Sequence, residues 1–248
     1  MNDSTERKLP TVPWTIGDII RAVILLAFGI IVLNVSLLAV VAVQSWLGNA
    51  AMFSELQRSP LVIGPTLIGG EALFFLAAWL FSVRKYGGDW KLLGYRVFPS
   101  SRGLSLAIVV VVFCLAVNVV YGLILNALGR QDLIPRQPVL DQLGRGPLGV
   151  AILFLAASVA APLAEETFFR GFLFPGLARR LGTILAAVIC AAAFAAAHFE
   201  IGALAPIFVL GLALTWLYYE TRSLWPSILV HASYNTLAVL ATLLVQQG

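Results

Sequence analysis

"PLGVAILFLAASVAAPLAEETFF", residues 147–169, runs from Pro147 to Ala164 without a charged side chain and then places two carboxylates side by side, Glu165 and Glu166. A membrane-spanning α-helix needs about 20 mostly apolar residues. The stretch is long enough, is rich in alanine and leucine, and lacks the period-two alternation of a β-strand. It therefore predicts a membrane helix that carries acidic groups inside it.

Six further stretches have the same apolar character, at about 19–43, 61–83, 103–127, 182–199, 203–220 and 225–246. Of the 248 residues, 60% are hydrophobic and 11% are charged, whereas about a quarter of a soluble domain is charged. The run 19–43 is too long for the core of a signal peptide, so we interpret it as a retained helix. We expect an all-α, polytopic transmembrane helix bundle of about seven spans.

The basic residues predict the orientation of this bundle. We expect a cytoplasmic N-terminal tail over residues 1–18, N-terminal transmembrane helices over 19–145 and a transmembrane core over 146–248. The lysines and arginines then satisfy the positive-inside rule, because eleven lie inside and four outside: Arg7, Lys8, Arg21, Arg84, Lys85, Lys91, Arg96, Arg102, Arg179, Arg180 and Arg222 against Arg58, Arg130, Arg136 and Arg145. The net charge of +4 thus indicates topology and not a nucleic-acid partner. An integral membrane protein is predicted, in the plasma (inner) membrane if the chain is bacterial.

Three charged side chains interrupt the fourth apolar stretch: Glu165, Glu166 and Arg170. Each ionised group at the centre of a membrane helix costs roughly 2.5–3.5 kcal/mol. Glu166 and Arg170 are four residues apart and can pair along one helix face. Glu165 points about 100° away from Glu166 around the helix, so it is free to face another helix.

The chain has two histidines, His198 in "FAAAHFE" and His231 in "VHASYNTLA", and both lie in late apolar stretches. Asn235 follows His231 by four residues, so both side chains share one helix face. If the late helices pack together, these groups and the charged trio meet in one buried site. Burial between helices also satisfies such groups best.

A simple alternating topology predicts that these residues lie at different depths in the membrane and so argues against a common site. It places Glu165 toward the cytoplasmic end of its helix, His198 toward the outer end of the next, and His231 near the inner start of the last. A common site therefore requires tilted, broken or unequal helices. Pro162 lacks a backbone donor and can loosen the hydrogen bonding of its helix close to the carboxylates.

A carboxylate and an imidazole can act as general bases on a water molecule, while a second imidazole and an amide can donate hydrogen bonds to an oxyanion. Two histidines and one glutamate also match the ligand set of a catalytic zinc ion, which would then be Glu165, His198 and His231. Both interpretations imply hydrolysis of a carbonyl compound, most plausibly a peptide bond. The sequence contains no HExxH, GxSxG or Walker A motif.

Three motifs carry a family resemblance: "EETFFR" (165–170), "FAAAH" (194–198) and "HASYN" (231–235). In this order they resemble the motifs of the CPBP family, intramembrane proteases named for CAAX-protein and bacteriocin processing and similar to type II CAAX prenyl endopeptidases. The resemblance covers about residues 147–240.

The resemblance implies a catalytic core in the last four helices and a role for each matching residue. Glu165 and His198 would activate water, His231 and Asn235 would form the oxyanion hole, and Glu166 and Arg170 would hold the first carboxylate in place. The substrate would be a membrane-associated protein or peptide, of a lipidated CAAX or bacteriocin-like type. The family pattern leaves open whether zinc takes part, and we favour the metal-independent assignment.

Two other functions compete with this hypothesis. A proton- or cation-coupled transporter would use the same Glu and His as an ion relay, and a noncatalytic membrane scaffold could retain the fold. At the residue level, Glu166–Arg170 is also explained as a structural ion pair, and Asn235 as a group that joins helices. Glu71, in "IGGEALFF", could face a substrate or be structural, and we favour the structural interpretation. We interpret the tryptophans, Trp14 among them, as anchors at the membrane interface.

Overall fold

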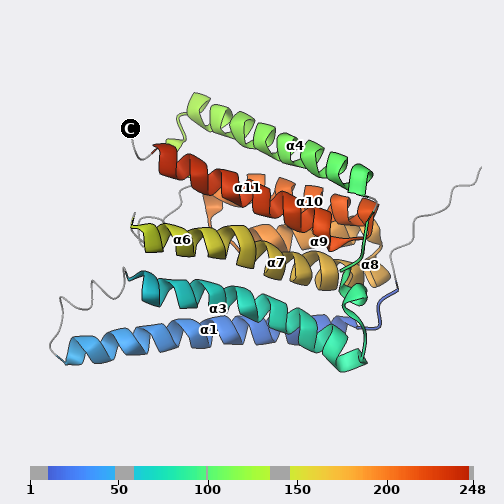
Figure 1. Cartoon of the computed structure of the whole chain (residues 1–248), viewed down its shortest axis with the longest axis horizontal. Helices are drawn as coiled ribbons and strands as arrows, with labels where there is room; N and C mark the ends of the chain where they lie inside the picture. Colours follow the sequence, from blue (N-terminus) through green and yellow to red (C-terminus); the bar gives the residue numbers. More distant parts are fainter. Residues whose placement is uncertain (1–10, 48–58, 99, 135–145, 246–248) are drawn as a thin grey trace, which may run out of the picture.

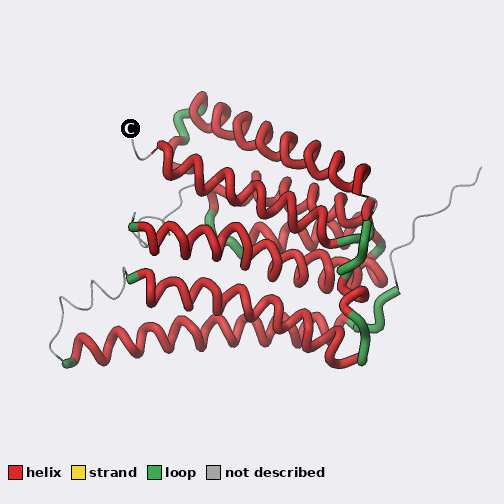
Figure 2. Tube along the Cα trace, viewed as in Figure 1, coloured by secondary structure: helices red, strands yellow, loops and turns green. Residues whose placement is uncertain are grey.

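The computed structural model describes residues 11–47, 59–98, 100–134 and 146–245, and every regular element within these ranges is a helix (Figures 1 and 2). Six helices are long and apolar enough to cross a membrane, and a seventh apolar helix is shorter. The predicted all-α, polytopic bundle is confirmed. Residues 1–10 of the expected tail lie outside the described ranges.

The single long helices are close to their predicted positions. They are α1 (Ile16–Trp46), α3 (Pro60–Trp79), α4 (Ser100–Ala127), α10 (Leu204–Thr221) and α11 (Leu224–Val245), and the short one is α9 (Thr183–Ala196). Short helices complete the chain: η1 (Leu80–Arg84), η2 (Trp90–Leu93), η3 (Gln131–Leu133) and η6 (Ile201–Ala203).

The fourth span is one continuous helical segment over residues 147–181. It consists of α6 (Pro147–Leu155), η4 (Ala156–Ala160), α7 (Ala161–Glu166), η5 (Thr167–Leu173) and α8 (Phe174–Leu181). The predicted end at residue 169 was therefore wrong. The helix continues through Arg179, which donates a hydrogen bond to the Val12 carbonyl oxygen at 3.1 Å, and it stops at Gly182, whose φ is +78°.

Two π-helical turns, η4 and η5, flank the carboxylates of this segment. In an α-helix the N–H of residue 162 would bond to the carbonyl of residue 158, but Pro162 has no N–H. A local π-helical turn can provide new partners for the backbone groups that a proline leaves unpaired. Such turns are frequent at functional sites. The expected loosening near Glu165 thus takes the form of a wider turn and not of a break.

The 147–181 segment lies between α3 on one side and α11 on the other (Figure 1). The pair α9 and α10 packs against its second half, α4 packs on α10 and α11, and α1 packs on α3. The segment is therefore surrounded by helices, and all seven residues of η5 are buried. Polar groups on this stretch can meet groups from α11 and α9.

The helices are of unequal length, which explains how residues from different spans can lie at the same depth in the membrane. The α9 helix has 14 residues and so rises only about 21 Å. The thiol of Cys190 on α9 lies 3.2 Å from the Phe169 carbonyl oxygen, whereas a Cβ added to Gly171 would contact Leu224, the first residue of α11. The stretch of the segment around Phe169 and Gly171 is therefore level with the middle of α9 and with the first turn of α11.

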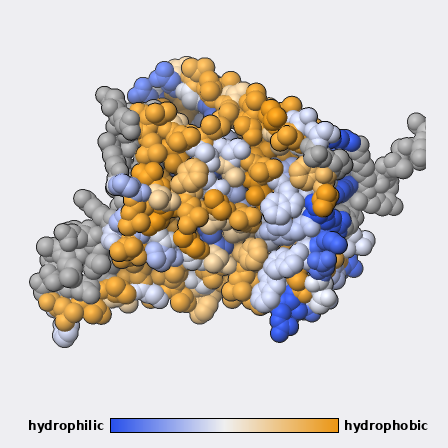
Figure 3. All heavy atoms as spheres, in the orientation of Figure 1, coloured by the Kyte–Doolittle hydropathy of each residue, from blue (hydrophilic) through white to orange (hydrophobic). Residues whose placement is uncertain are grey.

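One end of the bundle is strongly polar (Figure 3, right edge). It contains the start of α1, the connection from α3 to α4, the end of α8 and the turn between α10 and α11. Asp18 accepts hydrogen bonds from Lys85 and Tyr86 there, and Arg102 pairs with Glu220. We call it the basic end, since nine of the eleven described basic residues lie on the elements that form it: Arg21, Arg84, Lys85, Lys91, Arg96, Arg102, Arg179, Arg180 and Arg222. Arg130 and Arg170 lie elsewhere.

Trp14 belongs to the packed interior of this end and is not the interfacial anchor that we predicted. Its side chain is fully buried, its indole N–H donates to the Phe172 carbonyl oxygen at 2.9 Å, and its ring lies 5.4 Å from the Phe172 ring. The chain before α1 is thereby fixed against the second half of the 147–181 segment.

Candidate active site

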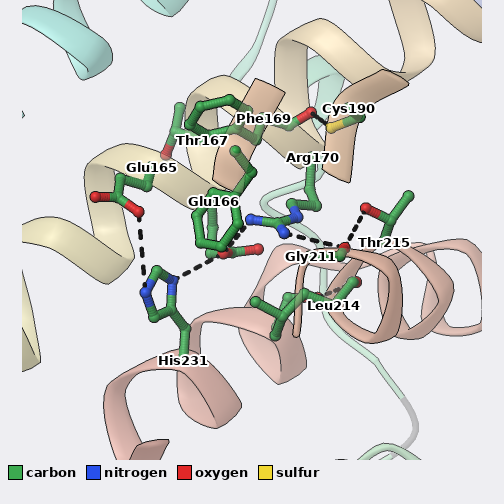
Figure 4. A network of polar contacts seen from close by, with 12 residues as sticks. Glu165, Glu166, Thr167, Phe169, Arg170, Cys190, Gly211, Leu214, Thr215 and His231 are labelled. Carbon is green, nitrogen blue, oxygen red and sulfur yellow. Dashed lines mark hydrogen bonds and ion pairs between the residues drawn. The ribbon is translucent and has the colours of Figure 1, made fainter. Parts of the chain in front are cut away.

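The two adjacent carboxylates lie at the end of α7 and point in different directions (Figure 4). The Glu166 side chain is fully buried, and the Glu165 side chain keeps 12% of its surface exposed. This difference follows from the angle of about 100° between consecutive residues of a helix. One carboxylate is thus enclosed by protein, and its neighbour can be reached.

Arg170 compensates the charge of Glu166 as the spacing predicted. Its Nη1 donates to Glu166 Oε1 at 2.7 Å, and its Nη2 donates to the Gly211 carbonyl oxygen at 3.1 Å. The guanidinium also lies 4.3 Å from the centre of the Phe194 ring, a favourable cation–π distance. The arginine therefore joins the 147–181 segment to α10 and α9 and fixes Glu166 in one position.

His231 on α11 lies between the two carboxylates (Figure 4). Its Nδ1 is 2.9 Å from Glu166 Oε1, and its Nε2 is 3.9 Å from Glu165 Oε2. Because a carboxylate accepts, the Nδ1 of His231 carries a proton. Glu166 thus sets the orientation of the imidazole and directs Nε2 toward Glu165.

His231 Nε2 and Glu165 Oε2 face each other without a direct hydrogen bond. The distance of 3.9 Å is too long for a hydrogen bond, and Glu165 Oε2 has no hydrogen-bond partner among the described residues. An oxygen atom placed about 2.8 Å from both atoms would form two hydrogen bonds at an angle of about 90°. The geometry therefore accommodates a water molecule or a carbonyl oxygen.

The structure places His198 in the turn after α9 as an exposed residue, and no hydrogen bond or ion pair joins it to either carboxylate among the described residues. His198 Nδ1 lies 2.8 Å from the Phe194 carbonyl oxygen, which makes Nδ1 a donor and leaves the Nε2 lone pair of a neutral ring free. The Phe194 ring has edge contacts with both imidazoles, at centroid distances of 4.9 Å to His198 and 5.6 Å to His231. Both histidines thus contact the same aromatic ring.

Asn235 contacts the site helix one turn beyond His231, where its Nδ2 donates to the Ala157 carbonyl oxygen at 2.8 Å. In the π-helical register of η4 that carbonyl would receive the N–H of residue 162. Residue 162 is proline, so the side-chain amide of Asn235 replaces the missing donor. An amide NH₂ group has two hydrogens, and the second is left for a ligand.

Glu71 on α3, for which we favoured a structural interpretation over a substrate-facing one, lies near the site. Its carboxylate interacts electrostatically with Glu165 and His231, and no described residue hydrogen-bonds to its Oε2. The signal in the sequence was a single carboxylate within an apolar run. That signal gave no partner, because α3 and the 147–181 segment are far apart in the chain.

We tested the alternative zinc ligand set against this arrangement. Among the described residues no group of three His, Cys, Asp or Glu side chains is placed to hold a metal ion. Glu165 and His231 face each other, but His198 does not complete a set with them. The residues in this arrangement do not fit a zinc ion, so no chemical step is assigned to a metal.

Comparison with known proteins agrees with the motifs. Residues 147–237 match the family described as "Type II CAAX prenyl endopeptidase Rce1-like". The chain is 25% identical over 154 residues to the "Putative membrane peptidase YdiL" of Bacillus subtilis (strain 168), which covers 62% of this chain and 56% of that protein. The chain thus spans little more than half the length of the curated relative that it matches. No solved structure matches it significantly.

The match and the relative confirm the resemblance to the CPBP family, and they support a membrane protease in general terms. The range matched by the family, residues 147–237, contains all six predicted site residues, namely Glu165, Glu166, Arg170, His198, His231 and Asn235. The role of each residue stays a prediction.

Proposed function

We propose that this chain, whose residues 147–237 match the Rce1-like family, is an intramembrane endopeptidase. The observation that supports this best is the placing of His231 between Glu165 and Glu166, 2.9 Å from one carboxylate and 3.9 Å from the other. A structural ion pair alone would not need a second carboxylate, whose Oε2 faces the imidazole without a hydrogen-bond partner among the described residues.

In the proposed reaction a water molecule lies against Glu165 and the scissile carbonyl oxygen lies against His231. Glu165 takes one proton from the water as its oxygen attacks the carbonyl carbon. The resulting oxyanion accepts hydrogen bonds from Nε2–H of a doubly protonated His231 and from the second N–H of Asn235. The carbon–nitrogen bond then breaks, and Glu165 gives the proton to the leaving amine.

The other residues hold these groups in place. Glu166 and Glu165 flank His231 with negative charge, which accommodates an imidazole that is protonated on both nitrogens. Arg170 keeps Glu166 in place, and the free Nε2 of His198 serves as a second acceptor for the water. Pre-organisation of this kind supplies a large share of enzymatic rate enhancement.

The proposed substrate is a membrane-associated protein or peptide, of a lipidated CAAX or bacteriocin-like type. The site supports this because it is enclosed by apolar helices that present many exposed hydrophobic side chains outward, as a lipid environment requires. The orange surface of Figure 3 shows one such face. We also propose that the basic end faces the cytoplasm and that the membrane is the plasma membrane.

The test is cleavage of quenched-fluorescent membrane peptides by the purified protein in liposomes. We expect Glu165→Gln and His231→Ala to lower kcat by about 10²–10⁴-fold, as the loss of positioned acid–base or oxyanion groups does. Glu220→Gln, which removes a carboxylate at the basic end, should leave kcat unchanged. Equal activity of all four proteins would refute the proposal.

The same assay decides between the metal-independent and zinc-dependent alternatives. The arrangement of ligands supports full activity after treatment with a chelator and removal of the chelated metal. Loss of activity that returns on addition of zinc would require His198 to move toward Glu165 and His231. A transporter would instead show ion flux across the same liposomes without cleavage.

A further inference from the structure

An apolar groove lies between α3 and α7, next to the site, and has a volume of about 680 Å³. Phe75 and Leu76 contribute from α3, and Leu163 and Ala164 contribute from α7. Ala164 directly precedes Glu165 in the chain, so the groove runs alongside the proposed catalytic carboxylate. A peptide segment in the groove would be close to the reacting groups.

Glu71 is the only charged side chain among the described residues that line this groove. It forms no hydrogen bond or ion pair with any described residue, and its Oε2 is buried. A polar group in a membrane-embedded segment is costly unless it has a partner. A bound molecule could therefore supply the partner that the Glu71 carboxylate lacks.

The charges near the groove are unbalanced. Three carboxyl groups, from Glu71, Glu165 and Glu166, share the neighbourhood of His231 with one guanidinium. Arg170 is committed to Glu166 at 2.7 Å, so neither Glu71 nor Glu165 has an arginine or lysine partner in the described part of the chain. The electrostatic character of the groove thus favours an incoming positive charge.

We propose that the groove binds the apolar segment of the substrate and that Glu71 selects a lysine or arginine side chain within that segment, near the bond to be cleaved. This inference rests on the proposed endopeptidase function and adds a specificity-determining residue to it. A lone cation on a membrane segment and a lone carboxylate in a membrane groove are each costly, and binding pairs them. A neutral segment gives Glu71 no partner, so it binds less well.

The first experiment measures the charge preference of cleavage. A neutral, apolar membrane peptide is compared with a series in which a single lysine is moved through the positions on either side of the scissile bond. Norleucine at the same positions is the uncharged control. We expect one position, or two neighbouring positions, at which lysine raises kcat/KM over norleucine by roughly ten- to hundredfold, the effect of a hydrogen bond to a charged group.

The second experiment assigns this preference to Glu71. Glu71→Gln should abolish the advantage of lysine over norleucine in kcat/KM, because Gln has the same shape and no charge. Glu71→Lys should instead favour a glutamate at the same position of the peptide. Glu220→Gln is the matched control, since it removes a carboxylate outside the groove and should keep the lysine preference.

A binding measurement separates failure of this inference from failure of the proposed function. The lysine and norleucine peptides carry a fluorophore, and their affinities for the full-length protein in detergent are measured by anisotropy. Tighter binding of the lysine peptide to wild type than to Glu71→Gln supports the role of Glu71 even if neither peptide is cleaved. Equal affinities, or a lysine preference that survives in Glu71→Gln, would overturn it and leave the groove as a site for lipid chains.

Discussion

Arg170 is the only arginine whose side chain is fully buried among the residues that the structure describes. It bonds to a carboxylate, to a backbone carbonyl and to an aromatic face at once. Removing one member of the Glu166–Arg170 pair is costly, because the charge of the other member stays buried without a partner. The stability of the site therefore depends on the pair and not on either residue alone.

We predict that Arg170→Met lowers the free energy of unfolding by about 3–5 kcal/mol, since it leaves the Glu166 charge buried without its guanidinium. The double variant Glu166→Gln/Arg170→Met should recover a large part of this loss. Unfolding in mixed micelles measures both. If the losses in the free energy of unfolding of the single variants Arg170→Met and Glu166→Gln simply add in the double variant, the two residues are not coupled as described.

The exposed pair of Arg102 and Glu220 provides the control. It has an N–O distance of 3.4 Å, and the Arg102 side chain is 61% exposed. Exposed pairs contribute about 0–1 kcal/mol. Arg102→Met should therefore change the free energy of unfolding little, and it does not call for a compensating change at Glu220.

At the scale of elements, Pro162 leaves its helix without one backbone N–H donor. Asn235 on α11 replaces that donor by a hydrogen bond to the Ala157 carbonyl oxygen. We predict that Asn235→Ala lowers the free energy of unfolding by about 1–3 kcal/mol, the cost of a buried carbonyl without a donor. Pro162→Ala supplies an N–H within the helix, so the double variant should regain much of this stability. Unfolding in mixed micelles again measures the effect.

Activity distinguishes the two roles of Asn235. If its second N–H also contacts the oxyanion, cleavage stays impaired in the double variant although stability returns. Asn118→Ala is the matched control, because Asn118 bonds to the Cys114 carbonyl oxygen and to Tyr234 and has no link to Pro162. Rescue of Asn118→Ala by Pro162→Ala would show that the effect is general and would contradict the specific repair.

A close approach between elements occurs at Gly171, where η2 packs on the 147–181 segment. An added Cβ would lie 2.6 Å from the Leu93 carbonyl oxygen, a backbone atom that cannot move alone. We predict that Gly171→Ala destabilises the protein by about 1–3 kcal/mol, as overpacking of a core does. Gly122→Ala on α4, where a Cβ meets nothing within 4 Å, should keep or slightly raise the thermal midpoint.

At the scale of the whole molecule, the basic end predicts the orientation in the membrane. We expect a cysteine placed at Val97, which is 99% exposed at that end, to react with an impermeant maleimide only after cells are opened. A cysteine at Leu128, 68% exposed beyond the end of α4, should react in intact cells. The native Cys114 and Cys190 are buried and give the background. The reverse pattern of labelling would invert the topology.

Much of this fold could be predicted from the sequence because lipid imposes simple rules. Long apolar runs without charges have one stable solution, so α1, α3 and α4 appeared within a few residues of their expected places. The extension of the fourth span to residue 181 was missed because "ARRLG" has the composition of a loop. Its helix is stabilised by a distant contact, from Arg179 to Val12.

The candidate site was predictable where its geometry is local. The pairing of Glu166 with Arg170 follows from their spacing of four residues. The place of His231 between two carboxylates, the bond of Asn235 to Ala157 and the approach of Glu71 all depend on how separate helices pack. No local pattern encodes such distances, and for the same reason Trp14 was misassigned to the membrane interface.

The short α9 helix has a consequence for the lipid around it. Its 14 residues cover about 21 Å, against about 30 Å of hydrocarbon in an ordinary bilayer. The acyl chains beside α9 must compress to avoid meeting the polar turn that follows, with His198 and Glu200 in it. The hydrophobic mismatch between this helix and the bilayer thus costs free energy, and lipids with shorter acyl chains lower that cost.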